Sequence, residues 1–359
     1  MSGQTITEDE AALYDRQIRL WGLDAQKRMR ASNILVISAN GLTGEVMKNI
    51  VLAGINSLTL LDSTLVSEEH LSAMFLVNSS HIGQNLAEAS LDAIRQLNPL
   101  VNVSADVSNA MEKPVEYFKR FDIVCMSSTN LDDITRIDSI CSDNRVKFLC
   151  GSVFGFYGFM FSNLGYHEYA EEIKVEKKAE SAEGPGEPKR AKLSEVKIET
   201  ETHTVRRSCQ FERFKSSLAV DWSKLSMKQL RKVSHIYFII RSLLDFSTLN
   251  GHKPSIEDAS AVLEQCRATM DSFHLPSSLL TDHFTVSNAC CPELSPVCAI
   301  VGGVLAQEIL KAVSHKDAPH NNHFLFDPES LAGIVECIHS SAFLPKKASS
   351  EKVTEELLL

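Results

Sequence analysis

The sequence has no C-x-x-C pair, although it contains nine cysteines in 359 residues. An odd number of scattered cysteines argues against a disulfide framework or a cysteine-rich zinc site, and it indicates reduced thiols in a cytosolic or nuclear protein. Positive charge is not in excess, because the formal net charge is −10, which argues against nucleic acid or an anionic membrane as a partner. No apolar run of membrane-spanning length is expected, and the acidic amino-terminal stretch MSGQTITEDEAAL is unlike a secretory signal.

The sequence contains enough apolar residues for a sizeable core. The stretch from Ile34 to Asp62 is the segment around which the rest of the chain is organised. Apolar runs at 34–37 and 58–61 flank a segment of helical periodicity from about 42 to 52, and the acidic Asp62 follows the second run. This order of strand, turn, helix and strand is the layout of a nucleotide-binding βαβ unit. It predicts a Rossmann-like domain.

The turn of this unit lacks most of the glycines that a phosphate site requires. Backbone N–H groups approach a phosphate closely only where side chains are absent or small. Here Ser38, Asn40 and Thr43 occupy the turn, beside Gly41 and Gly44. The sequence therefore predicts the architecture of a nucleotide-binding unit without a competent phosphate-binding turn.

Strands and helices alternate through the rest of the amino-terminal half, which predicts a doubly wound, mainly parallel α/β sheet. Expected helices span 86–97, 114–119 and 131–143, and expected strands span 101–103, 121–126 and 147–150. The glycine- and aromatic-rich segment 151–164 predicts an antiparallel continuation of the sheet. Further helices are expected over 225–244, 256–273 and 295–313, and further strands over 323–327 and 333–338.

Aromatic residues are absent from 171–202, where lysine and glutamate alternate. Such a segment has too little apolar surface to offset the entropy cost of ordering, which predicts a disordered charged linker. The chain is accordingly divided into a first part of the α/β domain at 1–170, the linker at 171–203, a helical insertion at 204–290, the carboxyl-terminal part of the α/β domain at 291–342 and a flexible tail at 343–359.

Near the amino terminus, Thr7 and Glu10 have the spacing of a capping box, which predicts the start of a short helix. This helix is expected to carry the segment YDRQIRLWG, with Arg16 and Arg19 on neighbouring turns. From the residues alone, both arginines are expected to be solvated side chains on an amphipathic helix.

Four segments together resemble the adenylating enzymes that activate ubiquitin-like proteins, the ThiF/MoeB-like family. They are YDRQIRLWG, the βαβ unit, SPVCAIVGGVLAQEILKAV and APHNNHFLFD, and the resemblance runs from about Glu8 to Ile338. Within the family, the chain is similar to the small subunits of heterodimeric SUMO-activating enzymes, which do not carry the catalytic cysteine. The resemblance implies a ThiF/MoeB-type adenylation fold with a helical insertion.

The resemblance also implies that the nucleotide-binding turn of this subunit is degenerate. Members that adenylate carry a G-x-G-G-x-G-x-E turn, in which the glycines make room for phosphate. The matching positions in this chain are Ser38, Asn40, Gly41, Thr43 and Glu45, so three of the four glycines are absent.

Other positions that serve ATP in active members are changed as well. The loop that supplies an Asn and an Arg to the phosphates matches 67–76, SEEHLSAMFL, which contains two glutamates and neither of those residues. The expected Lys falls at Leu86 and the Asp linked to Mg²⁺ falls at Thr129, whereas Asp62 matches the ribose-binding acid. Phosphates need positive charge and the metal needs carboxylate, so no intact cofactor or metal site is expected in this chain, and Asp62 is a vestige or a strand-end cap.

By the same resemblance, Arg16 is the residue of this chain that contacts ATP. In the family, the arginine of the Y-x-R-Q segment crosses to the partner's active site, and a guanidinium makes forked contacts to phosphate oxygens. Arg19 is expected to be structural or supporting. Cys290 and Cys291 are expected to be ordinary thiols, because the cysteine that forms the thioester belongs to the partner in the family.

The implied function is that of a regulatory and structural subunit that supports ATP-dependent adenylation of the SUMO carboxyl terminus. The implied partners are the large catalytic subunit, which binds ATP and Mg²⁺, together with SUMO and, through the complex, the SUMO-conjugating enzyme. The basic run Pro188–Leu193 is typical of a nuclear import signal or of a solvated charge cluster, and it favours a nuclear as well as cytoplasmic protein. Lys174 and Lys197 lie in aliphatic–Lys–x–Glu patterns typical of SUMO acceptors, although such short patterns also arise by chance.

Two alternatives stay open at this point. The chain could be an autonomous, homodimeric adenylating enzyme of the ThiF/MoeB type, which the degenerate turn disfavours. It could also be the small subunit that serves another ubiquitin-like modifier.

Overall fold

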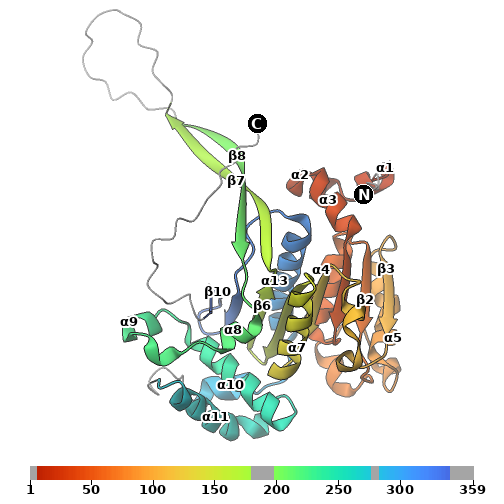
Figure 1. Cartoon of the computed structure of the whole chain (residues 1–359). Coiled ribbons are helices and arrows are strands. Elements are labelled where there is room, and N and C mark those ends of the chain that lie inside the picture. The colour runs from red at the N-terminus through yellow and green to blue at the C-terminus, as the bar shows by residue number, and fades with distance from the viewer. Residues whose placement is uncertain (1–5, 179–197, 276–282, 340–359) are drawn as a thin grey trace, which may run out of the picture.

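A computed structural model of the chain describes residues 6–178, 198–275 and 283–339. Figure 1 shows a central sheet flanked by helices, with a long two-stranded ribbon projecting from it. The first half contains α1 (Glu8–Leu13), α2 (Asp15–Trp21), α3 (Leu23–Ala31), β1 (Asn33–Ile37), α4 (Gly41–Leu52), β2 (Ser57–Leu61), α5 (Leu86–Leu97), β3 (Asn102–Asp106), α6 (Val115–Phe118), β4 (Ile123–Ser127), α7 (Leu131–Asp143), β5 (Lys147–Phe154) and β6 (Tyr157–Asn163). The second half contains β7 (Tyr166–Lys178), β8 (Ile198–Gln210), α8 (Phe214–Leu218), α9 (Met227–Leu230), α10 (His235–Asn250), α11 (Ala259–Ser272), α12 (His283–Ala289), α13 (Ser295–Ser314), β9 (His323–Asp327) and β10 (Ala332–Glu336).

The central sheet has eight strands in the order β10-β9-β6-β5-β4-β1-β2-β3. The five strands from β5 to β3 are parallel, and β6, β9 and β10 continue the sheet in antiparallel pairing. The strand order reverses direction after β3, where the chain crosses from the outer edge back to β4 beside β1. The expected α/β, Rossmann-like, mainly parallel sheet is therefore confirmed, as is its antiparallel continuation after residue 150.

Side chains of β1 are buried on both faces of the sheet, which explains its uninterrupted apolar sequence. Ile34 and Val36 pack in the core beneath α4, α5 and α13. Leu35 and Ile37 point the other way, into the core shared with α7, α10 and α11. The carboxyl end of β1 is thus fixed from both sides, and the turn that follows it has a rigid base.

Helix α13 is the one helix among the described residues that is long and apolar enough to cross a membrane, contrary to the expectation that no such run exists. Its most apolar window is 61% buried inside the protein, where it packs against α4, β5 and β6. Gly302 makes this packing possible, because a Cβ there would lie 2.8 Å from the Cβ of Glu45 on α4. The length and apolarity of α13 are thus those of a core helix of this fold.

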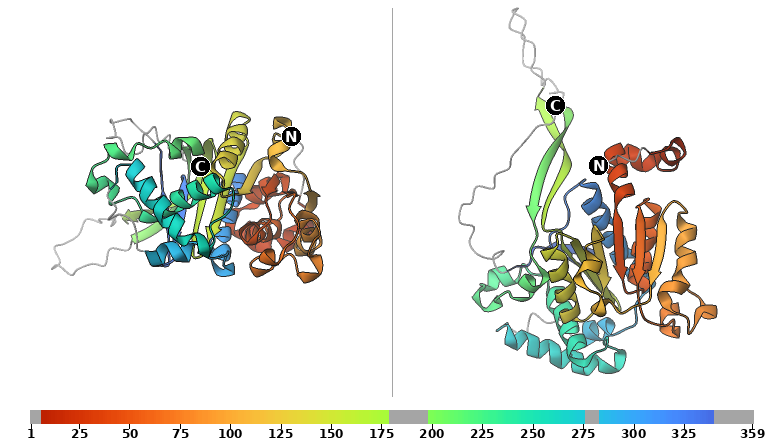
Figure 2. Two further views of the ribbon diagram at one scale, coloured as in Figure 1. Left: turned by 90° about the horizontal axis from the view of Figure 1, so that it is seen from below. Right: turned by 45° about the vertical axis from the view of Figure 1, so that its right-hand side comes forward.

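The prediction of a disordered charged linker over 171–203 is partly wrong. Residues 171–178 and 198–203 belong to β7 and β8, which pair along thirteen residues each as an antiparallel ribbon that projects from the body (Figures 1 and 2). Backbone pairing runs along the whole ribbon despite its polar sequence, and an ion pair of 3.3 Å between the diagonal neighbours Glu171 and Arg207 adds to it.

The remaining boundaries also shift. The insertion expected from residue 204 becomes helical only at α8, and the single helix expected over 225–244 is divided into α9 and α10, each preceded by a serine N-cap. The basic run Pro188–Leu193, Lys197 and the tail at 343–359 lie outside the described residues. Lys174 lies within β7, opposite Thr202.

His323 of β9 provides a test of the core. It lies among Phe161, Phe214 and Tyr237, its Nε2 has no hydrogen-bond partner in the described chain, and burial lowers its pKa to about 3. At a pH below the ordinary pKa of histidine, this side chain is therefore protonated in the unfolded chain and neutral in the folded chain. Stability should fall as the pH drops.

Replacing His323 with Phe should remove this contribution to the pH dependence of stability. Between pH 7 and pH 5.5, the loss in free energy of unfolding should be smaller in His323→Phe than in the unaltered chain by about 1 kcal/mol. Urea unfolding at the two pH values measures this loss. The exposed His274, changed to Asn, is the control that should leave the loss unchanged. Equal losses in all three proteins would contradict the account of His323.

Candidate functional site

The turn after β1 closes on itself through side chains rather than through glycines. Ser38 adopts a left-handed backbone conformation with φ of 67°. Asn40 then caps α4, since its Oδ1 accepts from the backbone N–H of Thr43 at 3.0 Å while its own N–H donates to Thr43 Oγ1 at 2.9 Å. The reciprocal cap satisfies the donors that begin a helix. Asn40 also donates from Nδ2 to Ser127 Oγ at 2.7 Å, at the end of β4.

The first N–H of α4 has a partner from a distant part of the chain. Gly41 donates to Glu293 Oε2 at 3.1 Å, and Lys253 pairs with Oε1 of the same carboxylate at 3.0 Å. The amino end of a helix carries partial positive charge and attracts anions. In this chain a carboxylate of the protein occupies that position.

Asp62, the residue that matches the ribose-binding acid, uses its oxygens on the local backbone. Its Oδ2 accepts from the N–H of Ala39 at 2.6 Å, and its Oδ1 accepts from the N–H of Thr64 at 2.8 Å and from Thr64 Oγ1 at 2.7 Å. The side chain is buried. These contacts are those of a cap that joins the ends of β1 and β2.

The loop after β2 lies directly on the start of α4. It contains a short 3₁₀ helix, Glu68–Ser72, whose two glutamates are exposed, and then turns inward. A Cβ at Gly41 would lie 2.6 Å from Ala73 Cβ, and one at Gly44 would lie 2.9 Å from Met74 Sδ. The two glycines of the turn therefore admit the chain's own loop to α4.

The two remaining positions that match ATP-binding residues of active members hold side chains without charge. Leu86 is fully buried at the start of α5, and its backbone N–H donates to Thr64 O at 3.0 Å. Thr129 is half-buried in the turn after β4. Neither position offers a cation to phosphate or a carboxylate to a metal. Among the described residues, no group of three or more His, Cys, Asp or Glu side chains is arranged to hold a metal ion.

A cavity of about 710 Å³ opens beside this closed turn. Its walls come from four parts of the chain that are far apart in sequence. It is lined by Asn40, Gly41, Glu69, His70, Ser72, Ala73, His252, Lys253, Pro254, Ser255, Ile256, Cys290, Cys291, Pro292 and Glu293. The cavity thus lies at the carboxyl end of the parallel strands, where open α/β sheets bind ligands.

Cys290, in the wall of this cavity, is not an activated thiol. Cys290 is almost fully buried, and burial raises its pKa to about 12. Burial also raises the pKa of the nearby Cys298 to about 12. Because the thiolate is the nucleophile, a raised pKa removes the reactive form near neutral pH. Cys291 is partly exposed, and its Sγ donates to Ser287 O at 3.7 Å.

Arg16 lies at the other end of the sheet, away from the turn and the cavity. Helix α3 ends just before β1 begins, so α1, α2 and α3 stand at the amino ends of the parallel strands (Figures 1 and 2). Arg16 is exposed on α2, and among the described residues it has no hydrogen bond or ion pair. Arg19 differs, because it pairs with Asp15 at 3.0 Å. The structure therefore leaves Arg16 as an available cation and does not bring it to the degenerate turn.

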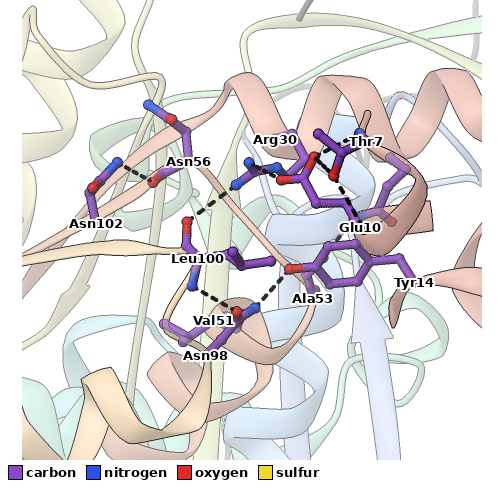
Figure 3. Close-up of polar contacts among 11 residues, drawn as sticks. Thr7, Glu10, Tyr14, Arg30, Val51, Ala53, Asn56, Asn98, Leu100 and Asn102 are labelled. Atoms are coloured by element: carbon purple, nitrogen blue, oxygen red, sulfur yellow. Dashed lines mark hydrogen bonds and ion pairs between the residues drawn. The ribbon is translucent and has the colours of Figure 1, made fainter. Parts of the chain in front are cut away.

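Tyr14, which precedes α2, connects this helix to the body of the protein, and Figure 3 shows its contact with Asn98. Its ring is buried and its hydroxyl accepts from Asn98 Nδ2 at 2.8 Å, while the same Nδ2 donates to Val51 O at 2.9 Å. Gly54 makes room for the ring, since a Cβ there would lie 2.5 Å from it. An ion pair between Arg30 and Glu10 joins α3 to α1, and the predicted capping box of Thr7 and Glu10 is confirmed.

Four residues important to this arrangement were not predicted from the sequence. They are Glu293, Lys253, Tyr14 and Gly54, and each acts through a contact distant in sequence. Glu293, for example, is 252 positions from Gly41. A signal did exist for Tyr14, which begins the segment YDRQIRLWG, but nothing in that segment indicates its contact with Gly54.

Comparison with known proteins shows the family of the chain. The ThiF family matches residues 14–346. SUMO-activating enzyme subunit 1 of Rattus norvegicus is 45% identical over 339 residues, covering 93% of this chain and 95% of that protein. The proteins of the same name from Homo sapiens and Danio rerio are 44% and 42% identical, covering 94% and 93% of this chain and 97% of each relative.

Among solved structures, Escherichia coli MccB, crystallised with succinimide, is similar in fold, with a TM-score of 0.52 and 10% sequence identity. The match covers 92% of this chain and 72% of MccB. The chain therefore belongs to the ThiF family, whose fold is the α/β adenylation fold, and within it to the family of the SUMO-activating enzyme subunit 1 proteins.

The packing of Tyr14 against Gly54 can be tested by adding a Cβ at Gly54. Gly54 has a φ of +82°, and Gly83 has a φ of +84° but nothing within 4 Å of its Cβ position. Gly83→Ala should cost only the backbone strain, about 1 kcal/mol, whereas Gly54→Ala adds a clash with Tyr14 and should cost at least about 2 kcal/mol. Urea unfolding gives both values. Equal costs for the two variants would mean that Tyr14 is not seated against Gly54.

Proposed function

We propose that this chain is the non-adenylating subunit of a heterodimeric SUMO-activating enzyme. The observation that carries the proposal is the closed turn at α4, where Glu293 occupies the position of an anion and Asp62 caps the backbone. The identity of 44–45% to mammalian SUMO-activating enzyme subunit 1 supports the choice of SUMO over another modifier. The same closed turn counts against an autonomous homodimeric enzyme.

In this proposal ATP and Mg²⁺ bind to the large catalytic subunit. The carboxylate at the SUMO carboxyl terminus attacks the α-phosphate of ATP, which gives the SUMO adenylate and releases pyrophosphate. A cysteine thiolate of the large subunit then attacks the acyl carbon, forms the thioester and releases AMP. The present chain carries no step of covalent chemistry, which agrees with the buried Cys290 and its raised pKa.

Arg16 is the contribution of this chain to the adenylation step. A guanidinium stays charged at all relevant pH values and makes forked hydrogen bonds to phosphate oxygens. Arg16 lies on a helix held by Tyr14, and it has no hydrogen-bond or ion-pair partner within 6–178, 198–275 and 283–339. A positioned cation of this kind stabilises the charge that develops on the phosphates of ATP in the partner's site.

The surface around Arg16 is suited to burial against another protein. Leu13 and Leu20 flank it with 62% and 70% of their surface exposed, and Leu52 at the end of α4 is also exposed. Several exposed apolar side chains on neighbouring elements are typical of a contact surface, whereas a single one is not. We propose that this surface, with the outer side of α13 at Ile300, forms part of the interface with the large subunit.

SUMO and, through the complex, the SUMO-conjugating enzyme are the further partners in this proposal. The basic run Pro188–Leu193 supports a nuclear location in addition to a cytoplasmic one. Both assignments follow from the proposed assembly and from the sequence of that run.

ATP–pyrophosphate exchange tests the division of labour. The isolated chain should show no SUMO-dependent exchange, and mixing it with the large subunit should restore exchange. Arg16→Ala in the complex should lower the exchange rate about 100-fold, the loss typical for removing one positioned donor from a transition state. Arg19→Ala is the matched control and should stay within about twofold, because that arginine is paired with Asp15. Normal exchange by the Arg16→Ala complex would refute the role of Arg16.

Assembly can be tested separately at Leu20. Leu20→Asp should weaken binding of the large subunit about tenfold or more, because the interface would bury a charge in place of an apolar side chain. Leu249, which is 74% exposed at the end of α10, is the control position, and Leu249→Asp should leave binding unchanged. Surface plasmon resonance on the purified variants gives the dissociation constants. If both variants bind as tightly as the unaltered chain, the surface around Arg16 is not an interface.

A further inference from the structure

The carboxylate of Glu293 lies in surroundings that resemble those of a bound anion. It is enclosed between the first N–H of α4, given by Gly41, and the ammonium group of Lys253, and its side chain is only 16% exposed. The three residues come from three separate parts of the chain. Their meeting point is the position at which a nucleotide-binding βαβ unit holds phosphate.

The contact is additional to the ordinary cap of α4. Asn40 and Thr43 already complete a reciprocal capping box, which satisfies the N–H of Thr43. Glu293 accepts from the N–H of Gly41, two residues before Thr43, and it does so where the missing side chain of Gly41 leaves room. A Cβ at Gly41 would lie 3.1 Å from Glu293 Oε2. The glycine therefore still admits an acceptor to the backbone, as a phosphate-binding turn does.

An external anion would meet Glu293 before it met α4. The cavity of about 710 Å³ beside the turn includes Gly41, Lys253 and Glu293 in its wall, so it leads to the same group of atoms. A phosphate group entering it would face the negative charge of Glu293, and it could reach neither the N–H of Gly41 nor a free Lys253 unless that carboxylate moved. Two negative charges in neighbouring positions repel each other, and the repulsion is stronger in a partly buried site than in water.

We propose that Glu293 is an internal occupant of the anion position at α4, and that it excludes phosphate-bearing ligands from the adjacent cavity. This inference rests on the proposed function, in which the nucleotide belongs to the partner. It goes further by assigning the exclusion to one carboxylate held by Lys253. The loss of three of the four family glycines from the turn is, in this account, not sufficient to close the site.

Binding of inorganic pyrophosphate to the purified full-length chain tests the proposal, by equilibrium dialysis at low ionic strength. Glu293→Ala should bind pyrophosphate at least about tenfold more tightly than the unaltered chain, the factor that one charge-assisted hydrogen bond supplies. Glu293→Gln should fall between the two, because its amide oxygen can still accept from Gly41 while the charge is gone. Adding Lys253→Ala to Glu293→Ala should abolish the gain.

A control variant separates the local effect from the change in net charge. Glu264 is exposed on α11 and lies outside the cavity lining, so Glu264→Ala should leave pyrophosphate binding unchanged. If Glu293→Ala does not fold, Glu293→Gln still decides the matter, because it keeps an acceptor at Gly41. A folded Glu293→Gln that binds no more tightly than the unaltered chain would overturn the inference. The proposed function fails by a different result, namely SUMO-dependent exchange by the isolated unaltered chain.

Discussion

The N–H groups at the amino end of a buried helix must find acceptors, and this requirement governs the site of the protein. In a nucleotide-binding βαβ unit the acceptor is a phosphate, so the turn is kept open. Here α4 finds its acceptors within the chain, in Asn40 for the N–H of Thr43 and in Glu293 for the N–H of Gly41. The same two strands, helix and core remain, but the start of the helix no longer needs a ligand.

This closure has a structural consequence for the rest of the domain. Loop residues Ala73 and Met74 pack where glycines leave space at α4, and Asp62 joins the ends of β1 and β2. The side chains at these positions thus contact the chain itself and stabilise the fold. In the proposed function, the contribution of this chain comes from the opposite end of the sheet. There Tyr14 holds the helix that presents Arg16 among exposed leucines, and Arg16 has no ion pair within the described part of the chain.

The sequence predicted those features that depend on neighbours in the chain. β1 and β4 are evident as apolar runs because both of their faces are buried, and the N-caps Asn85 and Asn130 place the starts of α5 and α7 at the predicted residues. The degenerate turn and the segment with Arg16 were likewise visible as short motifs. The family resemblance added the expectation that Arg16 acts in a partner's site, and its position in the structure is compatible with that role.

The features that escaped prediction depend on contacts between distant residues or on pairing between polar strands. The ribbon of β7 and β8 has the composition of a linker. It was missed because its strands are held by pairing with each other rather than by an apolar face. Glu293 is unremarkable in sequence, and only the fold brings its carboxylate to Gly41. Tyr14 and Gly54 are similarly separated in the chain, and their contact follows from the packing of Tyr14, at the start of α2, against the turn between α4 and β2.

The central claim is that the ATP site of the assembled enzyme lies in the partner and that the corresponding position in this chain is closed. The most direct test is the number of ATP molecules that the purified heterodimer binds in the presence of Mg²⁺, measured by equilibrium dialysis at saturating nucleotide. The account predicts one ATP per heterodimer and no binding to this chain alone. Two ATP molecules per heterodimer, with one of them retained by the isolated chain, would contradict it.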